Sequence, residues 1–221
     1  MRLRENPHEE HHSVLTGCLT PGGKRTWTFA ALLFLSYGTL ALAQTPNSGQ
    51  RLTSSKVIDY FVTLEETRLV AVADAMPQDK YPFSPTSGDF KGVRTFAQQL
   101  KLAAADNYIL GAAILGEKPP ADVGDETGPD SLRTKADVIQ YLKDSFAYLH
   151  RAVATIDDKN TVIDSPPISP MPKGTATRLG LAVEVLLHTF DHYGQMVEYL
   201  RMNGVVTPAS RLDAGGSGGM Q

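Results

Sequence analysis

Two histidines, His188 and His192, lie four residues apart in the sequence LLHTFDHYGQMVEYLRMNG, which covers residues 186–204. On a helix both imidazoles point from the same face, and this is the spacing by which one helix offers two nitrogen ligands to a metal ion. Glu184 lies one turn earlier on that face and Gln195 one turn later. A zinc or nickel site needs a third and usually a fourth ligand, so two hydrogen-bonded core histidines are the alternative interpretation.

Helical spacing of apolar residues predicts two long helices in the first half of the chain. The first spans residues 55–76 and ends before the segment MPQDKYPFSPTSG, and the second spans residues 93–115 and ends at GEKPP. The stripe expected to face the core in the first helix is Val57, Tyr60, Phe61, Leu64, Leu69 and Val72. The corresponding stripe in the second helix is Phe96, Leu100, Ala103, Asn107, Leu110 and Ile114.

Two further helices are predicted in the second half. Thr134 and Asp137 form a variant capping box that opens a third helix, whose stripe is Val138, Tyr141, Leu142, Phe146, Leu149 and Val153. The fourth helix spans residues 177–202 and ends at Asn203-Gly204, a typical left-handed C-terminal cap. It carries one stripe of Leu179, Val183, Leu186, Phe190, Val197 and Leu200, and a second, adjacent stripe of Leu181, Val185, His188, His192, Gln195 and Tyr199.

Four amphipathic helices of similar length predict an all-α fold, a four-helix bundle that buries every apolar stripe. The connections after the first three helices are long, each more than about ten residues, so a crossover connection is the alternative to a simple up-and-down order. The second stripe of the fourth helix, with both histidines, is expected to face the bundle interior near Leu102.

Residues 1–43 are typical of a signal peptide with a polar N-terminal lead. Lys24 and Arg25 precede an apolar run over residues 27–43 that ends in Ala-Leu-Ala, which predicts cleavage before Gln44. We therefore expect an exported protein, periplasmic or extracellular, that contacts a membrane only through the signal segment and is anchored there if the segment is not cleaved. Residues 44–54 are expected to be a linker, residues 55–211 the helical domain and residues 212–221 a flexible tail.

Composition excludes several kinds of site. The chain of 221 residues has one cysteine, Cys18, and it lies in the predicted signal peptide, so the mature chain has no disulfide, cysteine nucleophile or thiolate metal site. The formal net charge is −3, with 24 acidic and 21 basic residues, which argues against nucleic acid as a partner because phosphate binding needs a basic surface. The oligomeric state is open, with a homodimer as one alternative.

Four blocks of the sequence resemble successive parts of the DinB-like superfamily of four-helix proteins: AMPQDKYPFSPTSGDFKGVRTFAQQL, ADNYILGAAILGEKPP, KADVIQYLKDSFAYLHRAVATI and DHYGQMVEYLRMNGVVTPASR. The resemblance covers about residues 57–211 and is most specific in the closing His-x-x-x-His-Tyr-Gly-Gln block. It implies a bundle with a crossover connection. It also implies a metal site of one histidine from the second helix and two from the fourth, and His188 and His192 match the latter two.

The third ligand implied by the resemblance is missing, because FAQQLKLAAADNY places Leu102 at its position. We therefore expect a degenerate site that binds a divalent metal such as zinc, nickel, iron or manganese weakly or not at all. Two carboxylates could act as the third ligand instead: Asp106, one turn after Leu102, and Glu184. A ligand set of two histidines and one carboxylate suits zinc, iron or manganese. That set uses positions the family does not use, so a weakened or lost site is the favoured interpretation.

Three other polar residues have plainer interpretations. His150 falls off the apolar stripe beside Arg151 and is expected to be solvated. Asp191 cannot orient the His192 ring within the same helix, although it could pair across helices. Gln195 is expected either to hold a water or substrate or to satisfy a neighbouring helix.

Two classes of function follow. In the first, the chain is an exported relative of the DinB-like hydrolases and thiol transferases, and a metal held by His188 and His192 acts on an unknown small molecule. In the second, it is a non-catalytic bundle protein, related to stress or to the capture of a small ligand, that works without bound metal. Metal content distinguishes the two.

Overall fold

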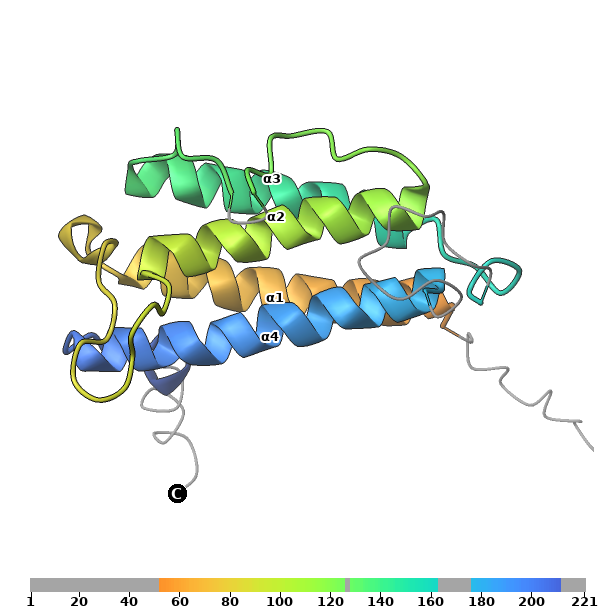
Figure 1. The fold of residues 1–221 in the computed structure, drawn as a ribbon. Coiled ribbons are helices and arrows are strands. Elements are labelled where there is room, and N and C mark those ends of the chain that lie inside the picture. Colours follow the sequence, from red (N-terminus) through yellow and green to blue (C-terminus); the bar gives the residue numbers. More distant parts are fainter. Residues whose placement is uncertain (1–51, 126–127, 163–175, 212–221) are drawn as a thin grey trace, which may run out of the picture. The chain divides into compact units, whose positions relative to one another are not determined.

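The computed structural model describes residues 52–125, 128–162 and 176–211 (Figure 1). Its long helices are α1 (Ser54–Ala75), α2 (Phe96–Leu115), α3 (Lys135–Val153) and α4 (Arg178–Met202), and a 3-10 turn, η1 (Gln78–Lys80), follows α1. No strand occurs in these ranges, which confirms the predicted all-α fold. The predicted signal peptide, most of the linker and the predicted tail lie outside the described residues. Within those described, no helix combines the length and hydropathy needed to cross a membrane.

Each long helix begins after a threonine whose hydroxyl accepts a hydrogen bond from a backbone N–H, and these caps are Thr53, Thr95, Thr134 and Thr177. The capping box predicted at Thr134 and Asp137 is confirmed. A second box, formed by Thr95 and Gln98, starts α2 three residues later than the apolar spacing predicts. Gly204 has φ 69°, so the predicted left-handed turn after α4 is also confirmed.

The helices do not pack in the order in which they follow one another. The main contacts of α2 are with α3 and α4, and those of α1 are also with α3 and α4, so α1 and α2 lie diagonally across the bundle. In Figure 1 the described parts of the connection from α2 to α3, residues 116–125 and 128–134, return along the length of the bundle, so that α2 and α3 run in one direction and α1 and α4 in the other. The crossover connection is therefore the one between α2 and α3.

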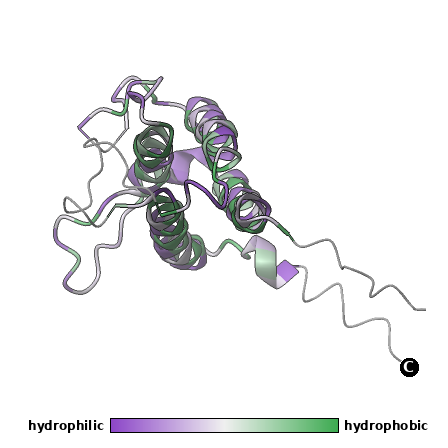
Figure 2. Ribbon diagram, turned by 90° about the vertical axis from the view of Figure 1, so that its right-hand side faces the viewer, coloured by the Kyte–Doolittle hydropathy of each residue, from purple (hydrophilic) through white to green (hydrophobic). Residues whose placement is uncertain are grey.

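The core contains the stripes predicted for α2 and α3, and all twelve of those residues are buried. In the end-on view of Figure 2 the hydrophobic colour gathers on the inward sides of the helices. The largest fully buried side chains include Phe96, Phe146, Leu100, Leu142 and Leu149. The stripe of α3 was correctly phased because that helix has one clearly apolar face, whereas α2 is buried on most of its sides, so most of its positions would satisfy the prediction.

The predicted stripe of α1 is wrong in its first half. Val57, Tyr60 and Phe61 are exposed, with 42%, 64% and 45% of their surface accessible. The buried face instead consists of Ile58, Val62, Glu65, Leu69, Val72 and Ala73. Two apolar faces one residue apart fit the same spacing, and only the packing of α1 against α3 and α4 selects between them.

A similar choice arises in α4. Of its first predicted stripe, Val183 and Phe190 are exposed and only Leu200 is fully buried. The second stripe faces the bundle as predicted, with Leu181, Val185, His192 and Tyr199 buried. The histidine face of α4 is therefore directed into the bundle.

The crossover connection is held close to α2. Gly128 has φ 74°, and a Cβ added to it would lie 2.7 Å from the Cβ of Lys101, so a residue other than glycine would be strained there. Lys101 Nζ donates to the Pro129 carbonyl at 2.9 Å, and Tyr141 Oη donates to the Asp122 carbonyl at 2.8 Å. These contacts bring Asp125 to the pocket described next.

Candidate metal centre

Asp106 of α2 and His188 and His192 of α4 converge between the two helices. Each offers one ligand atom, and these atoms all lie within 4.8 Å of one another. The Nδ1 atom of His188 is 3.1 Å from Oδ2 of Asp106. The imidazole rings stack with their centroids 4.5 Å apart, so the four-residue spacing places both rings side by side, as expected for one helix face.

The three residues form part of the wall of a pocket of about 390 Å³. Its lining comes from α2, from α4 and from the connections before and after α2, and it consists of Arg94, Leu102, Asp106, Asp125, His188, Asp191, His192 and Gln195. A volume of this size is in the range of small-molecule sites. The pocket is therefore a place where a small molecule can reach the cluster.

The most buried member of the cluster is His192, with 4% of its surface exposed. Its Nδ1 donates a hydrogen bond to the side-chain carbonyl of Gln99, whereas its buried Nε2 finds no hydrogen-bond partner among the described residues. Burial is the main cause that lowers the pKa of His192 to about 4; electrostatic interactions with His188 and Arg94 act in the same direction and the interaction with Asp191 acts against them. The ring is consequently neutral at pH 7, and a neutral imidazole with a free lone pair is the form that binds metal ions.

These observations fit a divalent metal ion. A buried imidazole nitrogen without a partner is costly unless something binds it, and this one belongs to a set of two nitrogen donors and one carboxylate oxygen that borderline metals prefer. The described residues therefore include a cluster that could hold a metal ion.

Comparison with known protein families matches residues 62–196 to the DinB superfamily. The chain belongs to the DinB superfamily. No curated protein gave a match. The matched range contains all three residues of the cluster, and the cluster agrees with a metal-binding member of this superfamily.

In this DinB-superfamily bundle the candidate site residues predicted from the sequence do not all lie at the pocket. Leu102 lines the pocket with 7% of its surface exposed. Asp106, one turn later, reaches the histidines, whereas Glu184 is exposed and does not line the pocket. The carboxylate that joins the histidines therefore comes from the helix opposite them, and the predicted weak or absent metal binding stays a prediction. Gln195 lies at the pocket and contacts α2, accepting a hydrogen bond from Gln99 at 2.7 Å.

Sequence reasoning missed three residues of the site. Gln99 is 2% exposed and lies on the face of α2 that also carries Leu102 and Asp106. A polar residue in this largely apolar helix could have indicated from the sequence that Gln99 belongs to the site. Arg94 and Asp125 come from connections, where periodicity gives no signal.

His150 is also placed differently from the solvated position expected of it. Its side chain is 26% exposed and lies between two carboxylates of α1, with Nδ1 2.5 Å from Asp59 Oδ1 and Nε2 3.1 Å from Glu66 Oε2. Asp59 and Glu66 are seven residues apart, two turns of one helix, so one ring can bridge them. The expectation failed because the partners are on another helix.

Proposed function

We propose that this chain binds one divalent metal ion through Asp106, His188 and His192, and that the metal site hydrolyses a small polar substrate in the adjoining pocket. The observation that carries the proposal is the buried Nε2 of His192, which has no partner in the described part of the chain and lies in a cluster whose ligand atoms are within 4.8 Å. Three protein ligands leave coordination positions for water and substrate, as in catalytic rather than structural metal sites.

The ligand set supports zinc, iron or manganese, with nickel as a further candidate. A divalent ion bound there would supply Lewis acidity, which polarises a carbonyl or phosphoryl oxygen and makes a water molecule more acidic. His192 enters this set with a neutral ring, so no proton has to leave that ring before metal binding.

The rest of the pocket suggests what the substrate carries. Arg94 is the cationic side chain among the lining residues outside the cluster, and Asp125 and Asp191 are acidic. A substrate with a carbonyl or anionic group would place that group toward Arg94, because the guanidinium donates in a fixed planar fork. Its nitrogen or hydroxyl donors would lie toward the two aspartates.

Export of the protein remains part of the proposal, supported by the sequence of residues 1–43. Thiol cofactors are scarce outside the cytoplasm, and export would therefore favour hydrolysis over thiol transfer. A role without metal is supported by one observation: Asp106 and His188 already contact each other at 3.1 Å. In that case the pocket would capture a small polar ligand, and metal content separates the two functions.

The experiment is a calorimetric titration of the full chain, purified without an immobilised-metal column and dialysed against a chelator, with zinc, nickel, manganese and ferrous ions. We expect one site per chain. The variant Asp106→Asn keeps the shape but removes the anionic ligand, and it should weaken binding at least tenfold, which corresponds to about 1.4 kcal/mol.

Glu184→Gln is the matched control, because Glu184 precedes His188 by one turn but is exposed and outside the pocket. Its affinity should equal that of the unaltered chain. Absence of metal binding, or equal affinity of Asp106→Asn and the unaltered chain, would overturn the proposed site.

A further inference from the structure

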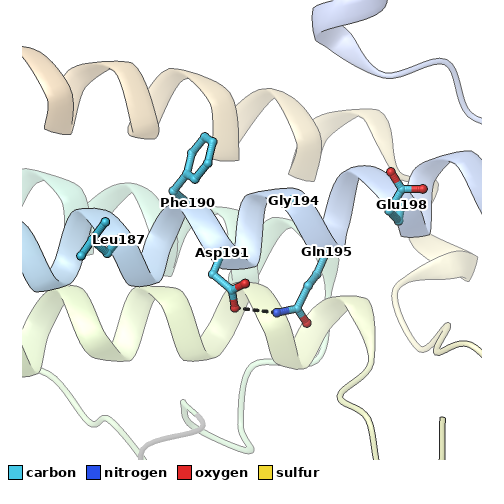
Figure 3. A pocket seen from close by; sticks show the side chains of 6 residues that line it. All are labelled: Leu187, Phe190, Asp191, Gly194, Gln195 and Glu198. Atoms are coloured by element: carbon cyan, nitrogen blue, oxygen red, sulfur yellow. Dashed lines mark hydrogen bonds between the residues drawn. The ribbon is translucent and has the colours of Figure 1, made fainter. Parts of the chain in front are cut away.

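A chain of hydrogen bonds leads from the edge of the bundle to His192. Asp191 Oδ2 accepts from Gln195 Nε2 at 2.7 Å, and Gln195 Oε1 accepts from Gln99 Nε2 at 2.7 Å. Gln99 Oε1 then accepts from Nδ1 of His192. Figure 3 shows the first of these bonds, with Asp191 and Gln195 pointing toward α2 and Phe190 pointing away from them toward α1.

The direction of this chain is set at its carboxylate end. An amide can present either its carbonyl or its NH₂ group to a neighbour, but a carboxylate oxygen only accepts. Gln195 must therefore turn its NH₂ toward Asp191 and its carbonyl toward Gln99. Gln99 in turn must direct its NH₂ to Gln195 and its carbonyl to His192, and a carbonyl accepts only from a protonated Nδ1.

We propose that Asp191 is a positioning residue that acts through Gln195 and Gln99 to hold His192 as the Nδ1–H tautomer, with the Nε2 lone pair directed at the metal cluster. Gln99 is 2% exposed and His192 4%, so water does not compete for the bond between these two residues, whereas the bonds of Gln195 are partly or fully accessible to water. Reversal of the chain would place a proton on Nε2, the nitrogen that a metal ion would need. The importance of the tautomer rests on the proposed function, but the tautomer itself is a property of the metal-free protein.

The test is therefore made first without metal. In ¹⁵N-labelled full chain, long-range ¹H–¹⁵N correlation of the imidazoles should show His192 with a protonated Nδ1 and an unprotonated Nε2. In Asp191→Asn the side chain at position 191 can donate as well as accept a hydrogen bond, so the series of hydrogen bonds to His192 can run in either direction. We expect this variant to gain a population with protonated Nε2.

Two further variants separate positioning from a general structural effect. Glu198→Gln makes the same carboxylate-to-amide change on α4 at a residue that pairs with Arg201, outside the histidine pocket, and it should leave the tautomer unchanged. The double variant Asp191→Asn, Gln99→Glu places a carboxylate directly against Nδ1 and should restore the Nδ1–H tautomer. Loss of a structural contact would not be rescued in this way.

Zinc titration of the same proteins gives the second readout. Asp191→Asn should bind zinc about 10-fold to 100-fold more weakly than the unaltered chain, the range typical for residues that orient a metal ligand. A protonated Nε2 of His192 in the unaltered protein, or an unchanged His192 tautomer in Asp191→Asn, would overturn the proposed series of hydrogen bonds. If the tautomers behave as expected but no variant binds metal, the chain of hydrogen bonds stands and the proposed metal function fails.

Discussion

Leu102 and Asp106 lie one helical turn apart on α2, and both line the pocket that contains His188 and His192. The leucine occupies the position at which the DinB-like resemblance implies a histidine, and the aspartate reaches the same two imidazoles from one turn further along. A helix repeats its face about every four residues, so a ligand lost at one position can be replaced from the next turn.

A histidine in place of Leu102 should add a fourth ligand to the three proposed. We expect Leu102→His to raise zinc affinity at least tenfold, or about 1.4 kcal/mol, and to raise the melting temperature when zinc is present, because a ligand that binds only the folded state stabilises it. Without metal the variant should be less stable by about 1–3 kcal/mol, since a buried leucine becomes a polar ring.

Leu110→His provides the comparison for that variant. Leu110 is also buried in α2, with 2% exposure, but it does not line the pocket. This change should cost stability without a gain in zinc affinity, as calorimetry and thermal unfolding would show. Equal zinc affinity for Leu102→His and the unaltered chain would mean that position 102 cannot reach the bound ion.

The pairing of His150 with Asp59 and Glu66 should make stability depend on pH. Burial alone would lower the pKa of His150, but hydrogen bonds to the two carboxylates outweigh burial and raise the pKa above its ordinary value. The stabilisation is therefore fully present below the unfolded pKa of about 6.5 and is lost as pH rises through the higher folded pKa.

Urea unfolding of the unaltered chain and of His150→Gln from about pH 5.5 to about pH 8.5 measures this effect. The free energy of unfolding should differ most at the acid end, by about 1 kcal/mol or less because the carboxylates are partly exposed, and the difference should shrink as pH rises. A difference that stays constant over the range would rule out the ion pairs as its cause.

A buried hydrogen bond joins α2 to α3. Asn107, with no exposed surface, donates from Nδ2 to Ser145 Oγ at 3.1 Å, and Ser145 Oγ donates to the Leu142 carbonyl at 2.7 Å. Ser145→Ala should lower the free energy of unfolding by about 1–3 kcal/mol, because it leaves a buried NH₂ group without an acceptor.

Chemical denaturation would measure the loss, and Asn107→Leu in the Ser145→Ala background provides the decisive comparison. Replacement of both polar partners by apolar groups can be nearly neutral, so the double variant should recover part of the lost stability. If it is no more stable than Ser145→Ala, the cost comes from packing and not from the unsatisfied amide.

The export prediction is tested in the host of the protein. Mass spectrometry of the native chain should show an N-terminus at or near Gln44, because Lys24, Arg25 and the apolar run that follows are typical of a cleaved signal. A soluble cytoplasmic chain that retains Met1 would contradict both cleavage and export.

Much of the fold could be predicted from the sequence because its determinants are local. The capping box at Thr134, the glycine after α4 and the apolar stripe of α3 act within a few residues of themselves. The same reasoning places His188 and His192 on one face of α4. No knowledge of the neighbouring helices is needed for any of these inferences.

Relations between helices required the tertiary structure. Sequence spacing could not choose between the two apolar faces of α1, and it could not place His150 between Asp59 and Glu66. Asp106 and Glu184 were likewise equal candidates as a third ligand. The histidine face of α4 is directed toward α2, and that orientation places Asp106 beside the imidazoles and leaves Glu184 exposed. The sequence of a helix fixes the directions of its own side chains, whereas the packing of the neighbouring helices decides which residues those side chains contact.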